Sequence, residues 1–178
     1  DAKSHFLGFE NIIYTSKYKK RRFLMTKYPV DLITILGPTA SGKTPFAAHL
    51  AHHLGDAEII SADSRMVYRG MTIGSGKDLD DYVVDGHHIP YHLIDICEAG
   101  YRFNVYEFQC AFQNAFMDIT ARGQLPIMCG GTGLYIESVL KSYELGQVRF
   151  PERNSLTIGL SIERDLRREK ISRRLKAR

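Results

Sequence analysis

A glycine-rich loop at residues 37–44 restricts the fold of this chain more than any other feature. Its sequence, GPTASGKT, follows the apolar, β-branched run of residues 30–36. After the loop, an apolar residue recurs at every fourth position from Phe46 to Leu54, as on one face of a helix. A loop between strand and helix, with Lys43 near its end, is typical of a phosphate-binding loop. The sequence therefore predicts a sheet that holds phosphate groups at the end of one strand.

Each part of this loop has a physical role in that interpretation. The glycines let the backbone N–H groups turn inward, the helix N-terminus adds partial positive charge, and Lys43 adds a full one. The hydroxyl of Thr44 is a hard oxygen ligand that suits Mg²⁺ bridging the same phosphates. The residues expected to bind the phosphates are Gly37, Pro38, Thr39, Ala40, Ser41, Gly42, Lys43 and Thr44.

Strand-like and helix-like segments alternate along the rest of the chain. Further strands are predicted at residues 58–61, 91–96 and 125–129. The most strongly marked helix follows Asn104, a good N-cap residue, with Glu107 three positions later and apolar residues at helical spacing after it. This alternation predicts an α/β fold, a P-loop NTPase-like parallel sheet flanked by helices.

Composition and charge suggest one catalytic core with basic ends. With 178 residues and 44% hydrophobic content, the chain can bury one sizeable core, which we place at residues 25–150. Residues 1–24 are an extension to which we assign no role. Residues 151–178 are predicted to be a basic helical segment. Five positive charges at 17–22 and a net charge of +5 at 163–178 leave the remainder acidic, because the whole chain carries +4.

Several protein classes do not fit the composition. No apolar run approaches the roughly 20 residues that span a bilayer, and the N-terminus lacks the features of a signal peptide. Cys97, Cys110 and Cys129 show no CxxC spacing, so neither a disulfide framework nor a zinc site is indicated. We expect buried thiols and a cytoplasmic, monomeric protein.

Two further loops could contribute to the site. Asp63 comes directly after the second predicted strand, where it could serve as a base or merely cap a turn. The glycine-rich loop at 130–133 follows the strand at 125–129 and could contact a ligand or permit tight packing. The residues alone leave both pairs of alternatives open.

Four sequence blocks in this order resemble the tRNA dimethylallyltransferase family. They are GPTASGKT, SADSRMVYRGMTIG, HLIDI and GGTGLYI, which lie within residues 31–140. The likeness resumes at 159–174 with GLSIERDLRREKISRR, which is similar to a basic helix of that family. Family members carry an insert before this helix that grips the anticodon arm. Here residues 151–159 directly join the two regions, so we expect the insert to be missing from this sequence.

The resemblance implies transfer of a dimethylallyl group from dimethylallyl diphosphate to N6 of an adenine next to the tRNA anticodon. It implies that Asp63 is the general base, that Thr132 lies beside the reacting centre and that Arg164 reaches the diphosphate together with Lys43. Nucleotide binding, of ATP in particular, is a further expectation for a loop of this kind. The tRNA-binding residues carried over are Asp63, Ser64, Arg65, Met66 and Thr132.

A flipped adenine would also need stacking partners, for which Arg65, Tyr68 and Arg69 are candidates. Two alternatives remain. A small-molecule P-loop kinase would use Asp63 as a base and Asp95, at the end of HLID, to hold Mg²⁺. A non-enzymatic nucleic-acid-binding module would use the basic ends, although it leaves the phosphate loop unexplained.

Overall fold

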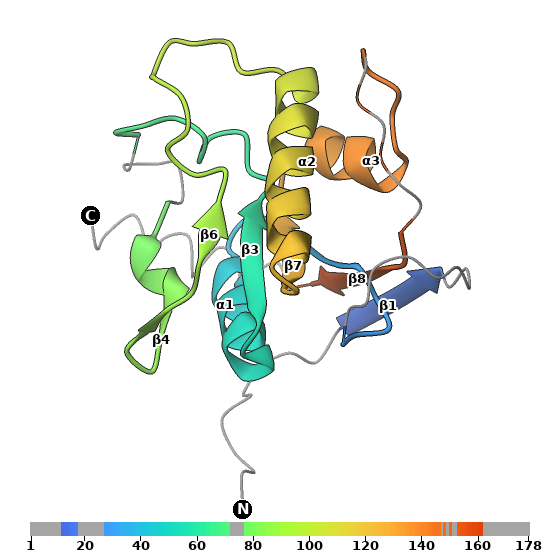
Figure 1. Ribbon diagram of the computed structural model, residues 1–178. Coiled ribbons are helices and arrows are strands. Elements are labelled where there is room, and N and C mark those ends of the chain that lie inside the picture. Colours follow the sequence, from blue (N-terminus) through green and yellow to red (C-terminus); the bar gives the residue numbers. More distant parts are fainter. Residues whose placement is uncertain are drawn as a thin grey trace, which may run out of the picture.

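The fold is built on one sheet whose parallel strands end at the same edge (Figure 1). The computed structural model describes residues 12–17, 27–71, 77–146, 148, 150 and 153–161. The elements are β1 (Ile12–Lys17), β2 (Leu32–Leu36), α1 (Lys43–Leu54), β3 (Ala57–Ser61), η1 (Leu79–Tyr82), β4 (Val83–Val84), β5 (His87–His88), β6 (Tyr91–His92), α2 (Val105–Ala121), β7 (Leu125–Gly130), α3 (Gly133–Leu140) and β8 (Ser155–Leu160).

The main sheet confirms the predicted parallel architecture. Its strand order is β1-β8-β2-β7-β3-β6, and every neighbouring pair is parallel except β1 with β8. The short strands β4 and β5 form a separate antiparallel ribbon. Leu36 pairs with Gly130, and Ser61 pairs with Cys129, so β2, β3 and β7 end side by side. The loops that follow these three strands therefore meet at one edge.

Side chains that alternate along the strands supply both faces of the sheet with apolar surface. In β2, Ile33 and Ile35 belong to the core that includes the buried alanines of α1, whereas Leu32 belongs to the core beneath α2 and α3. Figure 1 shows α2 in front of the sheet and α1 behind it. Because successive side chains in a strand point to opposite faces, each strand helps to hold helices on both sides.

The two best-marked helices form as predicted. In α2, Asn104 accepts a hydrogen bond from the Glu107 N–H, and the Glu107 carboxylate accepts one from the Asn104 N–H, which completes a capping box. Gly55 ends α1 in the left-handed conformation. The expected stripe of Phe46 and Leu54 is only partly buried, because the fully buried face of α1 consists of alanines.

Two expectations about the chain's organisation are wrong, and the segment to which no role was assigned contains a strand. The strand expected at 91–96 is only Tyr91–His92, since Leu93 and Asp95 take positive φ values that break an extended strand. Ser155–Leu160, placed in a helical segment, is a strand that pairs with β2, so the sheet extends beyond residue 150. The extension at 1–24 contains β1, which pairs with β8 at the edge of the sheet.

Candidate active site

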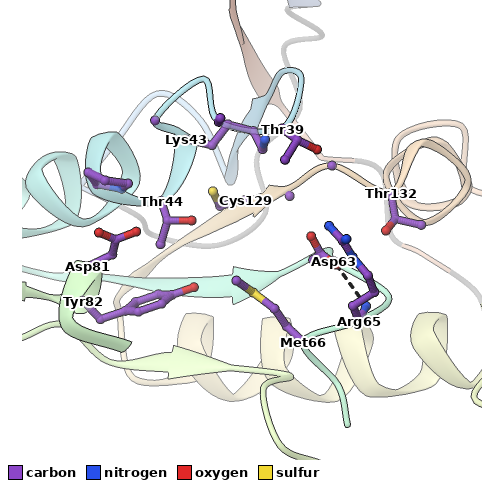
Figure 2. Close-up of a pocket in the computed structure, with 15 residues that line it drawn as sticks. Thr39, Lys43, Thr44, Asp63, Arg65, Met66, Asp81, Tyr82, Cys129 and Thr132 are labelled. Carbon is purple, nitrogen blue, oxygen red and sulfur yellow. Dashed lines mark hydrogen bonds and ion pairs between the residues drawn. The ribbon is translucent and has the colours of Figure 1, made fainter. Parts of the chain in front are cut away.

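The loops after β2, β3 and β7 enclose a cavity of about 280 Å³ at the edge of the sheet. It is lined by Thr39, Ala40, Gly42, Lys43, Thr44, Pro45, Asp63, Arg65, Met66, Asp81, Tyr82, Cys129, Gly130, Gly131 and Thr132. Figure 2 shows Asp63, Arg65 and Thr132 on one side, with Thr44, Asp81 and Tyr82 on the other. Four segments that are distant in sequence thus contribute polar groups to one space.

The phosphate loop lies between β2 and α1, as its sequence predicts. Gly42 has a φ of 82°, a left-handed conformation that favours glycine, and it directly precedes the first turn of α1. Lys43 is half-buried, and its Nζ lies 2.8 Å from the carbonyl oxygen of Pro38, so the ammonium group stays over its own loop. The side chains of Thr39 and Thr44 also face the cavity (Figure 2).

Three members of the predicted loop do not line the cavity. Gly37 is required for packing, because a Cβ there would lie 2.5 Å from the carbonyl oxygen of Leu160 in β8. Ser41 is buried, and its Oγ has no hydrogen-bond partner among the described residues. Pro38 acts through its carbonyl oxygen, which accepts hydrogen bonds from Lys43 and the Ser41 N–H.

Asp63 caps a turn and also lines the cavity. Its Oδ1 accepts a hydrogen bond of 2.9 Å from the backbone N–H of Arg65, as in a turn that an aspartate caps. The same carboxylate lines the cavity, where the guanidinium Nε of Arg65 lies 3.6 Å from Oδ1. Asp63 therefore remains available to a ligand on the cavity side while its backbone surroundings fix its position.

The second glycine-rich loop likewise serves both packing and the cavity. A Cβ at Gly130 would lie 2.4 Å from the carbonyl oxygen of Ala62, so only glycine lets β7 pass the end of β3 this closely. Thr132 lines the cavity, and its Oγ1 accepts a 2.9 Å hydrogen bond from the Ser64 N–H and donates to Ser64 Oγ at 3.2 Å. Ser64 itself does not line the cavity but ties two of its loops together.

Asp81, Tyr82 and Cys129 line the cavity without having been predicted as site residues. The first two belong to η1, a short turn that packs against α1 and carries no motif or periodic spacing. Burial raises the pKa of Tyr82 and raises that of the Cys129 thiol to about 12, so both are neutral near pH 7. Together with Met66 they give the cavity an apolar part beside its charged groups.

Other predicted site residues lie away from the cavity or outside the described residues. Asp95 does not line the cavity; its carboxylate pairs with Lys77 at 2.5 Å. Arg69 pairs with Glu98 at 2.7 Å and also lies off the cavity, so of the proposed stacking residues only Arg65 faces it. Arg164 lies outside the described residues, and its role stays a prediction.

The donor set can be compared with what a metal ion needs. Thr44 and Asp81 face the cavity together and offer a hydroxyl and a carboxylate, which are hard oxygen donors of the kind that Mg²⁺ prefers (Figure 2). Among the described residues, no group of three or more His, Cys, Asp or Glu side chains could hold a metal ion. This fits an ion held partly by substrate phosphates.

No helix in the described part of the chain is long and apolar enough to cross a membrane.

Two family models match the sequence. The model described as IPP transferase matches residues 66–178, and the model described as isopentenyl transferase matches residues 30–90. A tRNA dimethylallyltransferase 2 of Bacteroides fragilis strain YCH46 is 46% identical over 212 aligned positions, covering 86% of this chain and 68% of the relative. Because 212 positions exceed the 178 residues of this chain, the relative has residues without a counterpart here.

Other relatives and solved structures agree. A tRNA dimethylallyltransferase 1 of Azobacteroides pseudotrichonymphae is 66% identical over 115 residues, which cover 65% of this chain and 37% of that protein. The full-length tRNA isopentenylpyrophosphate transferase of Bacillus halodurans superposes with a TM-score of 0.60 at 41% identity, covering 68% of this chain and 39% of that one. A eukaryotic dimethylallyltransferase crystallised acting on tRNA gives 0.55 at 28% identity, covering 66% and 30%.

Proposed function

We propose that this chain, which belongs to the IPP transferase family, transfers a dimethylallyl group from dimethylallyl diphosphate to N6 of an adenine next to the anticodon of tRNA. One observation carries the proposal: a phosphate-binding loop and a carboxylate, Asp63, line the same cavity. The chain spans 68% of the length of the Bacteroides fragilis relative and 39% of the Bacillus halodurans chain.

The phosphate loop would hold the diphosphate and stabilise it as it leaves. When the bond between C1 of the dimethylallyl group and the bridging oxygen breaks, the electron pair stays on that oxygen. Lys43 and the N–H groups at the N-terminus of α1 are fixed positive groups that would stabilise this charge. A bound Mg²⁺ would neutralise further charge on the diphosphate, and Thr44 and Asp81 are the residues that would hold it.

The opposite side of the cavity would receive the adenine. An exocyclic amine is a weak nucleophile whose N–H becomes acidic only as the new bond to carbon forms, so a carboxylate within hydrogen-bond reach is a suitable acceptor. Asp63 occupies this side together with Arg65 and Thr132 (Figure 2). The reaction then balances: C1 exchanges oxygen for nitrogen, the diphosphate leaves with the electron pair, and Asp63 takes the proton.

The comparisons do not support the small-molecule kinase alternative, because the relatives and solved structures reported above are prenyltransferases. The structure gives no support to its metal ligand either, since Asp95 is engaged with Lys77 away from the cavity. A binding module without catalysis would leave the cavity and its loop without a role.

The decisive experiment is a transfer assay with dimethylallyl diphosphate labelled in the prenyl group and unmodified tRNA. We expect label in the tRNA, and none in a matched tRNA whose adenine beside the anticodon is replaced by inosine, which lacks the 6-amino group. A parallel reaction with γ-labelled ATP tests phosphate transfer. Label that passes only from ATP to a small acceptor would contradict the proposal.

A further inference from the structure

Lys77 and Asp95, which the proposed reaction does not use, form an ion pair outside the cavity. Lys77 comes from the segment before η1, and Asp95 comes from the HLIDI block after β6. The Lys77 side chain is fully buried, with an exposed fraction of 0%, and its Nζ lies 2.5 Å from Asp95 Oδ1. The same ammonium group donates to the carbonyl oxygen of Tyr68 at 2.6 Å. A buried lysine thus joins two loops that are separate in sequence.

Backbone hydrogen bonds join the same two loops alongside this ion pair. The N–H of Asp95 donates to the Met66 carbonyl at 3.0 Å, and that of Ile96 donates to the Val67 carbonyl at 2.8 Å. In the opposite direction, the Arg69 N–H donates to the Cys97 carbonyl at 2.8 Å. Residues 66–69 are therefore held against residues 95–97 by both backbone and side-chain contacts.

The loop after β3, whose residues 66–69 are held in this way, lines the cavity with its first residues. Asp63 and Arg65 line the cavity and precede the clamped residues without any intervening element, and Met66, the first clamped residue, lines the cavity as well. Burying an ammonium group is costly unless a close ionic partner and hydrogen bonds compensate, and replacing such a pair with apolar residues is often neutral for stability. The ion pair of Lys77 and Asp95 therefore suggests a role in holding residues 66–69 in one position.

We propose that Lys77 and Asp95 are positioning residues for the side of the cavity that would receive the adenine, where Asp63 and Arg65 lie. Neither residue lines the cavity; the pair holds residues 66–69 and thereby fixes where Asp63 and Arg65 stand relative to the phosphate loop. The inference rests on the proposed function for its effect on catalysis, but its structural part can be measured without any activity.

The chain offers a matched control at the other end of β3. There the buried carboxylate of Glu58 is paired with Arg122, whose Nη2 lies 3.0 Å from Glu58 Oε2. Neither of these two residues lines the cavity. Lys77→Met and Arg122→Met each remove the cation of an ion pair outside the cavity, but only Lys77 contacts the loop that follows Asp63 and Arg65. Lys77 is buried beside a partly exposed Asp95, whereas Glu58 is buried beside a partly exposed Arg122, so each pair has one buried charge. Loss of stability alone should therefore affect both variants.

The kinetic test compares these variants under the transfer assay. Lys77→Met should lower kcat/KM for tRNA by about 10- to 100-fold, because small displacements of catalytic groups are costly, and change KM for dimethylallyl diphosphate by less than about twofold. Asp95→Asn, which keeps the shape of the side chain and an oxygen acceptor, should act in the same direction with a smaller effect. Combining the two should cost little more than Lys77→Met alone, since both break one contact.

Amide hydrogen exchange tests the clamp independently of catalysis. In Lys77→Met, the amides of Arg69, Asp95 and Ile96 should exchange faster than in the parent, whereas Arg122→Met should leave them unchanged. Unchanged exchange at these amides in a folded Lys77→Met protein, or equal losses of kcat/KM for tRNA in both variants, would overturn the inference. If the parent transfers no dimethylallyl group but exchange responds as expected, the proposed function fails while the clamp stands.

Discussion

At the scale of single residues, fixed backbone groups hold the polar side chains of the cavity in place. Asp63 is oriented by the Arg65 N–H, Thr132 by the Ser64 N–H, and Lys43 by the Pro38 carbonyl. Each of these contacts leaves part of the side chain facing the cavity. Substitutions that preserve the backbone contact but change the charge should therefore separate chemistry from folding.

Lys43→Ala should lower dimethylallyl transfer by at least about 100-fold, the scale of losing one group that stabilises developing charge. Its free energy of unfolding should stay within about 0.5 kcal/mol of the parent value, because the side chain does not fill a core. Steady-state transfer rates and urea unfolding measure the two effects. Lys27→Ala is the control, since Lys27 is an exposed lysine whose partner is Asp56 and which lies off the cavity. Turnover near the parent level in Lys43→Ala would refute the role of the loop.

Asp63→Asn should lower the chemical step by roughly 10²- to 10⁴-fold, the usual cost of a lost acid–base group. Asparagine keeps an oxygen that can accept the Arg65 N–H, so the turn should persist and diphosphate binding should survive. Single-turnover kinetics and calorimetric titration with dimethylallyl diphosphate check the two halves of this prediction. A variant with normal turnover and lowered stability would mean that Asp63 serves only the turn.

At the scale of elements, two glycines allow strands and loops to approach closely at the active edge. Gly37 passes beside the end of β8, and Gly130 passes beside the loop that follows β3. Such contacts between backbones exclude any side chain, including that of alanine. The position of each loop around the cavity therefore depends on a strand from a different part of the chain.

Gly130→Ala should destabilise the protein by about 1–3 kcal/mol, as expected when an added methyl group forces backbone shifts in a packed region. It should also impair transfer, because Gly131 and Thr132 follow directly. Gly133→Ala is the matched control three residues later, where an added Cβ meets nothing within 4 Å and should leave stability equal or slightly higher. Urea unfolding of both variants gives the comparison; equal stabilities would contradict the close approach at Gly130.

The sequence predicted those elements whose local signals agree with their surroundings. The run before the phosphate loop, the alanine-rich α1 and the Asn104 capping box all combine local preference with burial. The strand at 91–96 was overpredicted because Leu93 and Ile94 are buried in loop conformations rather than in a ladder. Asp81 and Tyr82 could not be predicted as site residues, because only the packing of η1 against α1 brings them to the cavity.

At the scale of the whole molecule, the sheet separates two hydrophobic cores. Charged side chains lie both where its parallel strands end and near where β3 begins. The cavity occupies the end where β2, β3 and β7 finish. Near the start of β3, the Glu58 carboxylate is buried and contacts both Arg122 and His92. Burial by itself raises the pKa of Glu58, but hydrogen bonds from Arg122 and His92 outweigh burial and hold the pKa below its ordinary value.

This shift predicts how acid affects the molecule. A carboxyl group whose pKa is lower in the folded state stabilises the fold above its unfolded pKa, and that contribution is lost as the pH falls through the folded value. Glu58→Gln should therefore be less stable than the parent at neutral pH, and the gap should narrow as the pH falls below 4.5, the ordinary value. Thermal unfolding at a series of pH values measures the gap. Glu137→Gln, in an exposed pair with Lys141, should show a much smaller gap.

The pairing of β8 with β2 also determines when β2 gains its last neighbour during synthesis of the chain. Asp31 accepts a hydrogen bond from the Asn154 N–H across 123 positions of the chain, and β8 lies directly beside the strand that leads into the phosphate loop. During synthesis, β2 therefore keeps one open edge until the residues up to 160 have left the ribosome. The phosphate loop at residues 37–44 is synthesised before the other segments that line the cavity. It therefore spends the longest time without the segments that surround it in the fold. Slow elongation late in translation would prolong the period in which this edge can pair with another chain.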